Sequence, residues 1–380
     1  MRKILAALLV PFLLFAVTGC ANHRNSDIGN RIVLQGVGVD YEDENYILTL
    51  QVFNLSQASP SGVESSENVT TLYTTRGRTI SEAVNGIRQF VGKSPMFSHN
   101  RVLVVSEAAA ATGLRNILDY FVRDYSTRPS IDFALTRGKA ADIIGADFGN
   151  VTIPAEEIAR LLESQTKKAR VQVMNIVNRY LETGIDPIAP LLEIIKEEPK
   201  EGTSVAVSGA AVLQDDYVCG YLDGIQAQVA LLIDGNIKNN HIDLPIGEYG
   251  NIGLYFVDCD SKYDVGLDGE QPYANISVDV RFDINAIQNS PQELTQEKVE
   301  GIRSAIEKYL ENSCQQVLDQ LMKDYRSDVF GFGRAMLMAE TDYFKSVSDH
   351  WHDILPQIQT SVDVQVEIRR IGQEDIRWNA

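Results

Sequence analysis

The sequence predicts a mixed α/β protein of the α+β type, divided into more than one domain, with mostly antiparallel sheets packed by helices. Patterns typical of strands and patterns typical of amphipathic helices follow one another along the chain. A chain of 380 residues is too long for one compact core of ordinary size. The longest helical pattern, residues 292–325, has one continuous apolar face, which must be buried against another layer. We therefore expect one long C-terminal helix lying on a sheet.

The first residues have the features of a lipoprotein signal peptide. A charged start and an apolar run over residues 4–17 lead to the small residues Thr18 and Gly19, directly before Cys20. The apolar run is shorter than the about 20 residues that a membrane-spanning helix needs. We predict that residues 1–19 are removed and that Cys20 becomes the lipidated N-terminus, with an S-diacylglycerol and an N-palmitoyl group. The alternatives are an ordinary signal peptide cut elsewhere and an uncleaved anchor.

The charge of the chain limits what the mature protein can bind. The formal net charge is −18, and residues 1–19 contain two basic residues and no acidic one. The mature surface is therefore still more acidic and repels nucleic acids and anionic lipid headgroups. Residues 20–30 are predicted to be a lipidated linker, so the body is held to the membrane by lipid or by a partner.

Residues 31–198 are predicted to form an N-terminal α/β region. The expected strands are residues 31–40, 46–54, 70–76, 101–106 and 131–136. The expected helices are residues 79–91, 107–111, 113–123, 139–144, 154–168 and 171–181. Thr79 can cap its helix, with Glu82 as the capping-box partner, and Gly92 ends it. Residues 56–68, rich in Ser, Gly, Pro and Glu, are expected to be a loop.

Residues 199–380 are predicted to form a C-terminal α+β region. The boundary is placed by the charged stretch 193–202, which contains Pro and Gly, and a further division near 235–290 is left open. The expected strands are residues 204–213, 217–222, 273–284 and 361–371, with strands and turns over 236–284. The expected helices are residues 224–232, 292–325 and 344–351. Residues 328–333 are expected to be a glycine-rich turn.

Three cysteines remain besides Cys20. Cys219, Cys259 and Cys314 show neither a CxxC motif nor a Cys/His spacing typical of zinc sites. Cys314 falls in the apolar face of the long helix, which favours a thiol in the core. The sequence favours three free thiols, and a Cys219–Cys259 disulfide is left open.

No motif supports an enzyme. The chain has no P-loop, GxSxG or HExxH sequence, and the glycines at 36–38 lack the third glycine and the helix of a dinucleotide site. His99 has no recognisable nucleophile as a neighbour, so we expect a structural role. His350 and His352 flank Trp351 and diverge on a helix, so joint metal binding is not expected. The aspartates between 258 and 268 lack the spacing of a calcium loop and are expected to be a solvated acidic loop. We predict no catalytic residue, no metal site and no cofactor.

Several motifs occur in an order that resembles the C-subunit lipoproteins of spore germinant receptors, the Ger(x)C family. They are the lipobox ending at Cys20, the Gly-Val-Gly-Val-Asp hairpin at 36–40, the helix entry at 75–83, Ser98-His99-Asn100 before a strand, the segment 119–124 with Arg128, the turn 328–333 and His350-Trp351. The chain departs from the family by lacking the Trp that commonly follows the lipidated Cys.

The resemblance implies a non-enzymatic, three-domain lipoprotein of sporulating cells. Such subunits are anchored at the outer face of the spore inner membrane, the cell membrane of the spore. They assemble with two integral-membrane subunits, A and B, into a nutrient receptor that triggers germination. It further implies that this chain acts as scaffold or signal transducer, and that Ser98, His99 and Asn100 form a structural family motif. A solute-binding lipoprotein of a transporter is the main alternative, and an extracytoplasmic hydrolase is another.

Overall fold

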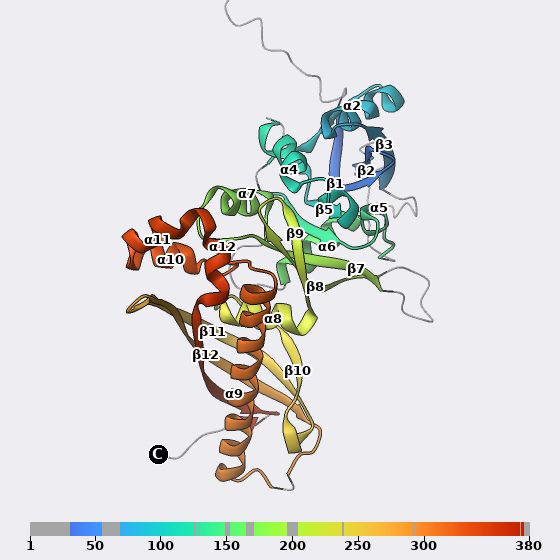
Figure 1. Cartoon of the computed structure of the whole chain (residues 1–380). Helices are drawn as coiled ribbons and strands as arrows, with labels where there is room; N and C mark the ends of the chain where they lie inside the picture. The colour runs from blue at the N-terminus through green and yellow to red at the C-terminus, as the bar shows by residue number, and fades with distance from the viewer. Residues whose placement is uncertain are drawn as a thin grey trace, which may run out of the picture.

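The computed structural model confirms the predicted mixed α/β fold and shows two sheets (Figure 1). It describes residues 31–54, 69–124, 127–128, 130–148, 153–164, 171–195, 204–237, 239–291, 293–372 and 374–375. The predicted signal peptide, the lipidated linker with Cys20 and the predicted loop 56–68 lie outside these residues.

The first sheet has nine strands and a parallel centre. Its strands are β1 (Arg31–Glu42), β2 (Asn45–Phe53), β3 (Thr70–Gly77), β4 (Ser94–Met96), β5 (Val102–Ser106), β6 (Asp132–Thr136), β7 (Ile188–Ile195), β8 (Ser204–Gln214) and β9 (Tyr217–Asp223). The order is β3-β2-β1-β5-β6-β7-β8-β9, with β4 beside β1. Strands β1, β5, β6 and β7 run parallel, and the outer strands pair antiparallel.

Helices cover both faces of this sheet. They are α2 (Ile80–Val91), α3 (Glu107–Ala110), α4 (Leu114–Arg123), α5 (Ala140–Ile144), α6 (Pro154–Ser164), α7 (Val173–Leu181) and α8 (Gly224–Ile233). Leu103 and Val105 pack in one core cluster with α2, α4 and α7, whereas Val102 and Val104 pack in another with α5 and α6. Strand β5 is consequently buried along its whole length, as expected for a strand covered on both faces.

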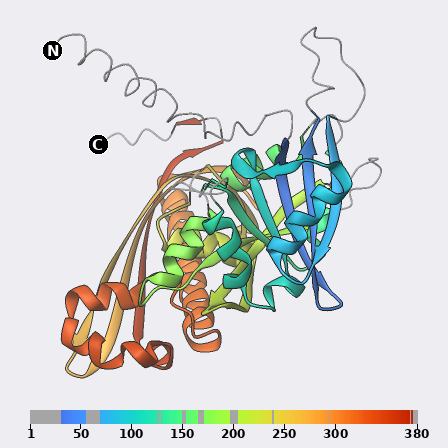
Figure 2. The ribbon, with the colours of Figure 1, turned by 90° about the horizontal axis from the view of Figure 1, so that it is seen from above.

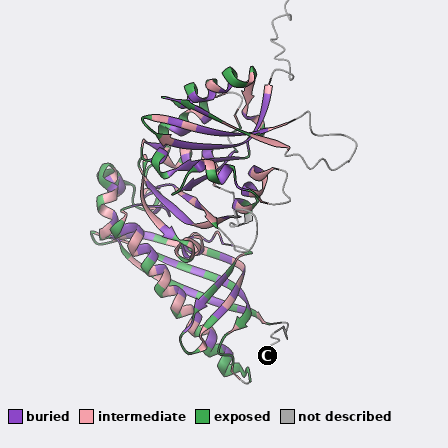
Figure 3. Cartoon of the chain, turned by 90° about the vertical axis from the view of Figure 1, so that its right-hand side faces the viewer, coloured by how far each residue is buried: buried purple, intermediate pink, exposed green. Residues whose placement is uncertain are grey.

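The second sheet belongs to the C-terminal half and carries the long helix. Its strands are β10 (His241–Pro245), β11 (Asn251–Asp268), β12 (Gln271–Ile287), β13 (Gln359–Ile371) and β14 (Glu374–Asp375). Strands of this sheet alternate between buried and exposed residues (Figure 3), because one face meets helix α9 (Gln296–Asp319) and the other meets water. The predicted long helix on a sheet is therefore confirmed, and a π-helical turn (Gln320–Asp324) extends it.

Three short helices complete the chain before its last strands: α10 (Phe332–Ala339), α11 (Thr341–Val347) and α12 (Trp351–Ile354). Figures 1 and 2 place α10 and α11 on the opposite side of the molecule from β1, β2 and β3.

Local signals in the sequence account for the ends of α2. The Thr79 hydroxyl accepts the Glu82 N–H at 3.1 Å, and Gly92 ends the helix with a φ of 67°. The Glu82 carboxylate accepts the N–H of Arg78, at 2.9 Å. Half of the predicted capping box is thus present, with the second bond shifted by one residue.

Three local expectations differ from the structure. Strand β7 begins at Ile188 and runs into the charged stretch 193–202, where the domain boundary was predicted. The acidic residues between 258 and 268 lie on β11 and not in a loop. The predicted turn at 328–333 is shorter, because α10 begins at Phe332.

The sheet extends across the predicted domain boundary, since β7 before it and β8 after it are antiparallel neighbours. The division at residues 198–199 remains a prediction. Within the described residues Cys219, Cys259 and Cys314 are not joined in a disulfide, as the sequence favoured.

Candidate functional site

The predicted family motif, Ser98-His99-Asn100, lies directly before β5, a central strand of the first sheet. Ser98 and His99 end a short 3₁₀ helix, and Asn100 precedes β5. His99 is exposed, whereas Asn100 is buried at 4% exposure. Within the described residues the Asn100 side-chain amide has no hydrogen-bond partner. A structural role for the three residues stays a prediction, and Cys20 lies outside the described residues.

The carboxylate of Asp328, a residue that the sequence did not single out as a site residue, accepts four hydrogen bonds. Its Oδ1 accepts the N–H groups of Gly331 and Phe332, both at 2.8 Å. Its Oδ2 accepts the N–H of Gly333 at 2.7 Å and the indole Nε1–H of Trp351 at 2.9 Å. Asp328 is 1% exposed, so these donors replace water around a buried charge.

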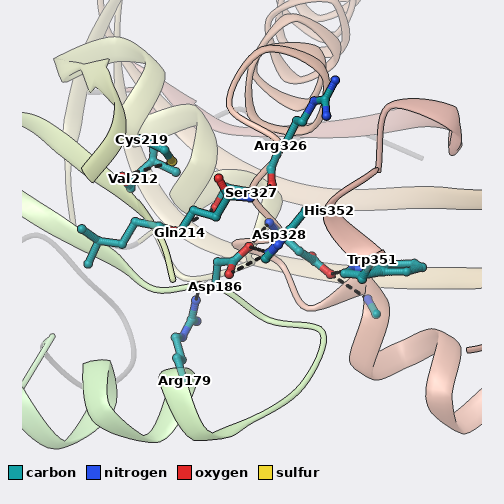
Figure 4. A network of polar contacts seen from close by, with 12 residues as sticks. Arg179, Asp186, Val212, Gln214, Cys219, Arg326, Ser327, Asp328, Trp351 and His352 are labelled. Carbon is teal, nitrogen blue, oxygen red and sulfur yellow. Dashed lines mark hydrogen bonds and ion pairs between the residues drawn. The ribbon is translucent and has the colours of Figure 1, made fainter. Parts of the chain in front are cut away.

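Asp186, on the connection between α7 and β7, joins this carboxylate to the N-terminal half (Figure 4). The Asp186 N–H donates to the carbonyl oxygen of Asp328 at 2.7 Å. In return the Asp328 N–H donates to Asp186 Oδ2 at 2.6 Å. Asp186 Oδ2 also lies 3.0 Å from Nε2 of His352 on α12. Residues 142 positions apart in the chain are thereby joined by reciprocal bonds.

Arg179, on α7, bridges the same two segments. Its Nη1 donates to the carbonyl oxygens of Asp186 and Val329, both at 2.9 Å. We call Arg179, Asp186, Asp328, Trp351 and His352 the junction cluster.

Two glycines allow the backbones to meet beside the cluster. A Cβ on Gly184 would lie 2.6 Å from the carbonyl carbon of Gly333, and a Cβ on Gly333 would lie 2.7 Å from Trp351 Nε1. The N–H of Arg334 donates to the Gly184 carbonyl oxygen at 3.0 Å. No side chain fits between the two segments at this point.

The charges of the cluster respond to burial and to one another. Burial raises the pKa of Asp328 to about 6, against the effect of the Gly333 N–H and the Trp351 indole. The hydrogen bond to Asp186 raises the pKa of His352. Burial lowers the pKa of Arg179. At neutral pH Asp328 is mainly ionised, which matches its surroundings of N–H donors.

The arrangement suits a mechanical connection between the two halves. All groups bonded to the Asp328 side chain are N–H donors held by the fold. Among the described residues no group of three or more His, Cys, Asp or Glu side chains could hold a metal ion. The sequence offered one hint of the cluster, an Asp followed by two closely spaced glycines, whose N–H groups can converge on a carboxylate.

Replacement of His352 by Gln is expected to lower the free energy of unfolding by about 0.5–1 kcal/mol at pH 6 and by less at pH 9. Because the folded state raises the pKa of His352 above its ordinary 6.5, the stabilisation is complete below that value and is lost as the pH rises through the raised pKa. Urea denaturation of both proteins at the two pH values measures the difference.

The matched control is His350→Gln, since His350 is exposed and has no side-chain hydrogen bond in the described part of the chain. A difference for His352→Gln that is equal at both pH values would contradict the assignment.

None of the helices in the described ranges is both long and apolar enough to span a membrane. The fold and the junction cluster define a mixed α/β protein of two sheets whose halves are joined through buried carboxylates. This fold is shared with a solved structure described as the GerBC protein, with a TM-score of 0.59 and 19% sequence identity over 88% of this chain and 96% of that chain.

The sequence model of the spore germination protein N-terminal domain matches residues 24–194. The model of the spore germination B3/GerAC-like C-terminal domain matches residues 208–372. The chain therefore belongs to the spore germination GerAC family of C subunits, which confirms the resemblance seen in its motifs.

Curated relatives match over similar lengths. Spore germination protein KC of Bacillus subtilis (strain 168) is 24% identical, covering 98% of this chain and 96% of its own. Spore germination protein B3 of the same organism is 23% identical over 95% of this chain and 96% of its own. Spore germination protein A3, also from that organism, is 25% identical over 64% of this chain and 63% of its own.

Proposed function

We propose that this chain is the lipid-anchored, non-enzymatic C subunit of a nutrient receptor that triggers spore germination. It works beside two integral-membrane subunits, A and B, at the outer face of the spore inner membrane. The observation that carries the proposal is the match of both family models, in order, across nearly the whole chain. Relatives that match over almost their full length are named as spore germination proteins.

The lipid on Cys20 supplies the attachment in this proposal. With a formal net charge of −18, the body gains nothing from electrostatic attraction to an anionic membrane surface. Acyl chains on Cys20 hold it there, provided that at least two are present, since one chain binds only weakly. Residue 24, where the N-terminal family model begins, follows the anchor closely, which keeps the body near the membrane partners.

The junction cluster supports a role as scaffold or signal transducer. A body whose halves are joined by buried, reciprocal hydrogen bonds passes a displacement of one half to the other. In this proposal the halves act as one body between the A and B subunits.

Deletion of the gene is expected to abolish or strongly reduce germination in response to at least one nutrient, in spores that lack redundant receptors. Complementation with the unchanged gene restores the response. An unchanged response of the deletion strain to every nutrient tested would overturn the proposed function.

Replacement of Cys20 by Ala is expected to move the protein from the membrane fraction to the soluble fraction, because no lipid can be attached to Ala. The strain used lacks the A and B subunits, so that partners cannot retain the protein. The matched control is Cys219→Ala, which removes a half-buried thiol of the body and should leave the protein in the membrane fraction. Retention of the Cys20→Ala protein would refute the anchor.

A further inference from the structure

A cavity of about 310 Å³ lies where the two halves meet, between α7, the strands β7 and β8, and α8. Its apolar walls come from both halves of the chain. They include Leu162, Ile176, Ile188, Ala210, Leu231 and Phe330. Because a water molecule occupies about 30 Å³ in the liquid, the cavity has room for about ten non-hydrogen atoms. Its volume is at the lower end of the range for ligand sites.

Among the described residues, one cation lines this apolar cavity, the guanidinium of Arg179. Its Nη1 is used by two backbone carbonyls, which leaves Nε–H and the two N–H groups of Nη2. Within the described residues these donors have no hydrogen bond, and no carboxylate lies within ion-pair distance. Burial lowers the pKa of Arg179, which reflects a positive charge with little water around it.

Two other polar groups of the cavity wall, Asp234 and Gln228, offer an anionic ligand no charged hydrogen-bond donor. Asp234 lines the cavity and already has a polar interaction of its own. Its negative charge also stabilises the charged form of Arg179 by electrostatic attraction, which raises the pKa of Arg179. Gln228 lines the cavity too, and its buried side-chain oxygen accepts no hydrogen bond from the described residues. Arg179 is therefore the group of the cavity wall whose unpaired N–H donors best match an anionic ligand.

We propose that this cavity binds a small monocarboxylate with an apolar body, whose carboxylate is held by Nε and Nη2 of Arg179. The two nitrogens form the planar fork that binds carboxylates through two parallel hydrogen bonds. The apolar body of the ligand lies against the aliphatic wall and Phe330. The proposal stands on the cavity alone and does not rest on the proposed function.

The site is connected to the junction cluster through Arg179 itself. The same guanidinium that takes the ligand holds the carbonyl oxygens of Asp186 and Val329, and Val329 also lines the cavity. A ligand that pairs with Arg179 fixes its orientation, so binding stabilises the contact between the two halves.

Hexanoate and hexanamide, which differ in charge and little in size, are suitable probes. Binding to the full chain in detergent is measured by ligand-observed saturation-transfer NMR. We expect saturable binding of hexanoate and at least about tenfold weaker binding of hexanamide, the loss typical of one charge-assisted hydrogen bond. Arg179→Gln is expected to weaken hexanoate binding at least about tenfold as well.

A second variant keeps the test decisive if Arg179→Gln does not fold. Ala227→Leu adds volume at the cavity wall on α8 and should abolish hexanoate binding, with Arg179 unchanged. Ile225→Leu, on the same helix at an exposed position, is the control and should bind as the parent does. Equal binding of hexanoate and hexanamide, no saturable binding of hexanoate, or full binding by Ala227→Leu would each overturn the proposal.

Discussion

Replacement of Asp328 by Ala is expected to lower the free energy of unfolding by about 3–5 kcal/mol, the range for removing one partner of a buried charge network. The change leaves three N–H donors without an acceptor, those of Phe332, Gly333 and the Trp351 indole. The Gly331 N–H keeps only its bond to the carbonyl oxygen of residue 328, at 3.4 Å. Each unsatisfied buried donor costs about 1–3 kcal/mol, although such costs do not add fully. Urea denaturation followed by circular dichroism measures the change.

Two further variants make this result interpretable. Asp349→Ala removes an exposed carboxylate just before α12, the helix that carries Trp351. It should change the stability by no more than about 0.5 kcal/mol. Asp328→Asn keeps one acceptor oxygen and points an N–H₂ group at donors, so we expect a loss between those of the other two variants. A loss below about 1 kcal/mol for Asp328→Ala would show that the junction cluster does not hold the halves together.

Features encoded by neighbouring residues were predictable from the sequence. Helix α2 follows from Thr79 at its start and Gly92 at its end. Strand β12 follows from alternation, because Ile276, Val278, Val280 and Phe282 all face the core. Each of these signals lies within a few residues, so no knowledge of the tertiary fold is needed to read it.

Strand β7 escaped prediction because its sequence carries a proline and ends in a charged stretch. Pro190 cannot donate a ladder hydrogen bond and therefore indicates an edge or a loop. It fits here because β7 pairs with β6 only at Leu191, opposite Leu135, and relies on β8 for the rest of its length.

The junction cluster could not be predicted, because its bonds join distant parts of the chain. Asp186 and Asp328 are 142 residues apart. No local sequence pattern around either residue predicts a contact with the other. The glycine-rich segment 328–333 suggested a turn, yet the Asp328 side chain satisfies the N–H groups at the start of α10 and so allows a helix to begin there.

Replacement of Gly184 by Ala is expected to lower the free energy of unfolding by about 3 kcal/mol, from two separate causes. Gly184 has a φ of +77°, a conformation that disfavours any side chain by about 1–2 kcal/mol. The new Cβ would also lie 2.6 Å from the backbone of Gly333, and overpacking of this kind costs about 1–3 kcal/mol. Urea denaturation again measures the loss.

Gly269→Ala separates the two causes. Gly269 has a φ of +64°, and a Cβ there would meet nothing within 4 Å, so the control carries the conformational penalty without the clash. If Gly184→Ala lowers the free energy of unfolding more than Gly269→Ala does, the difference is the cost of the clash between the new Cβ and the backbone of Gly333. Equal losses would mean that the halves separate readily at this contact. A body with such a loose junction would not transmit a displacement between its halves, so the role of transducer would have to be given up while that of a tethered scaffold could stand.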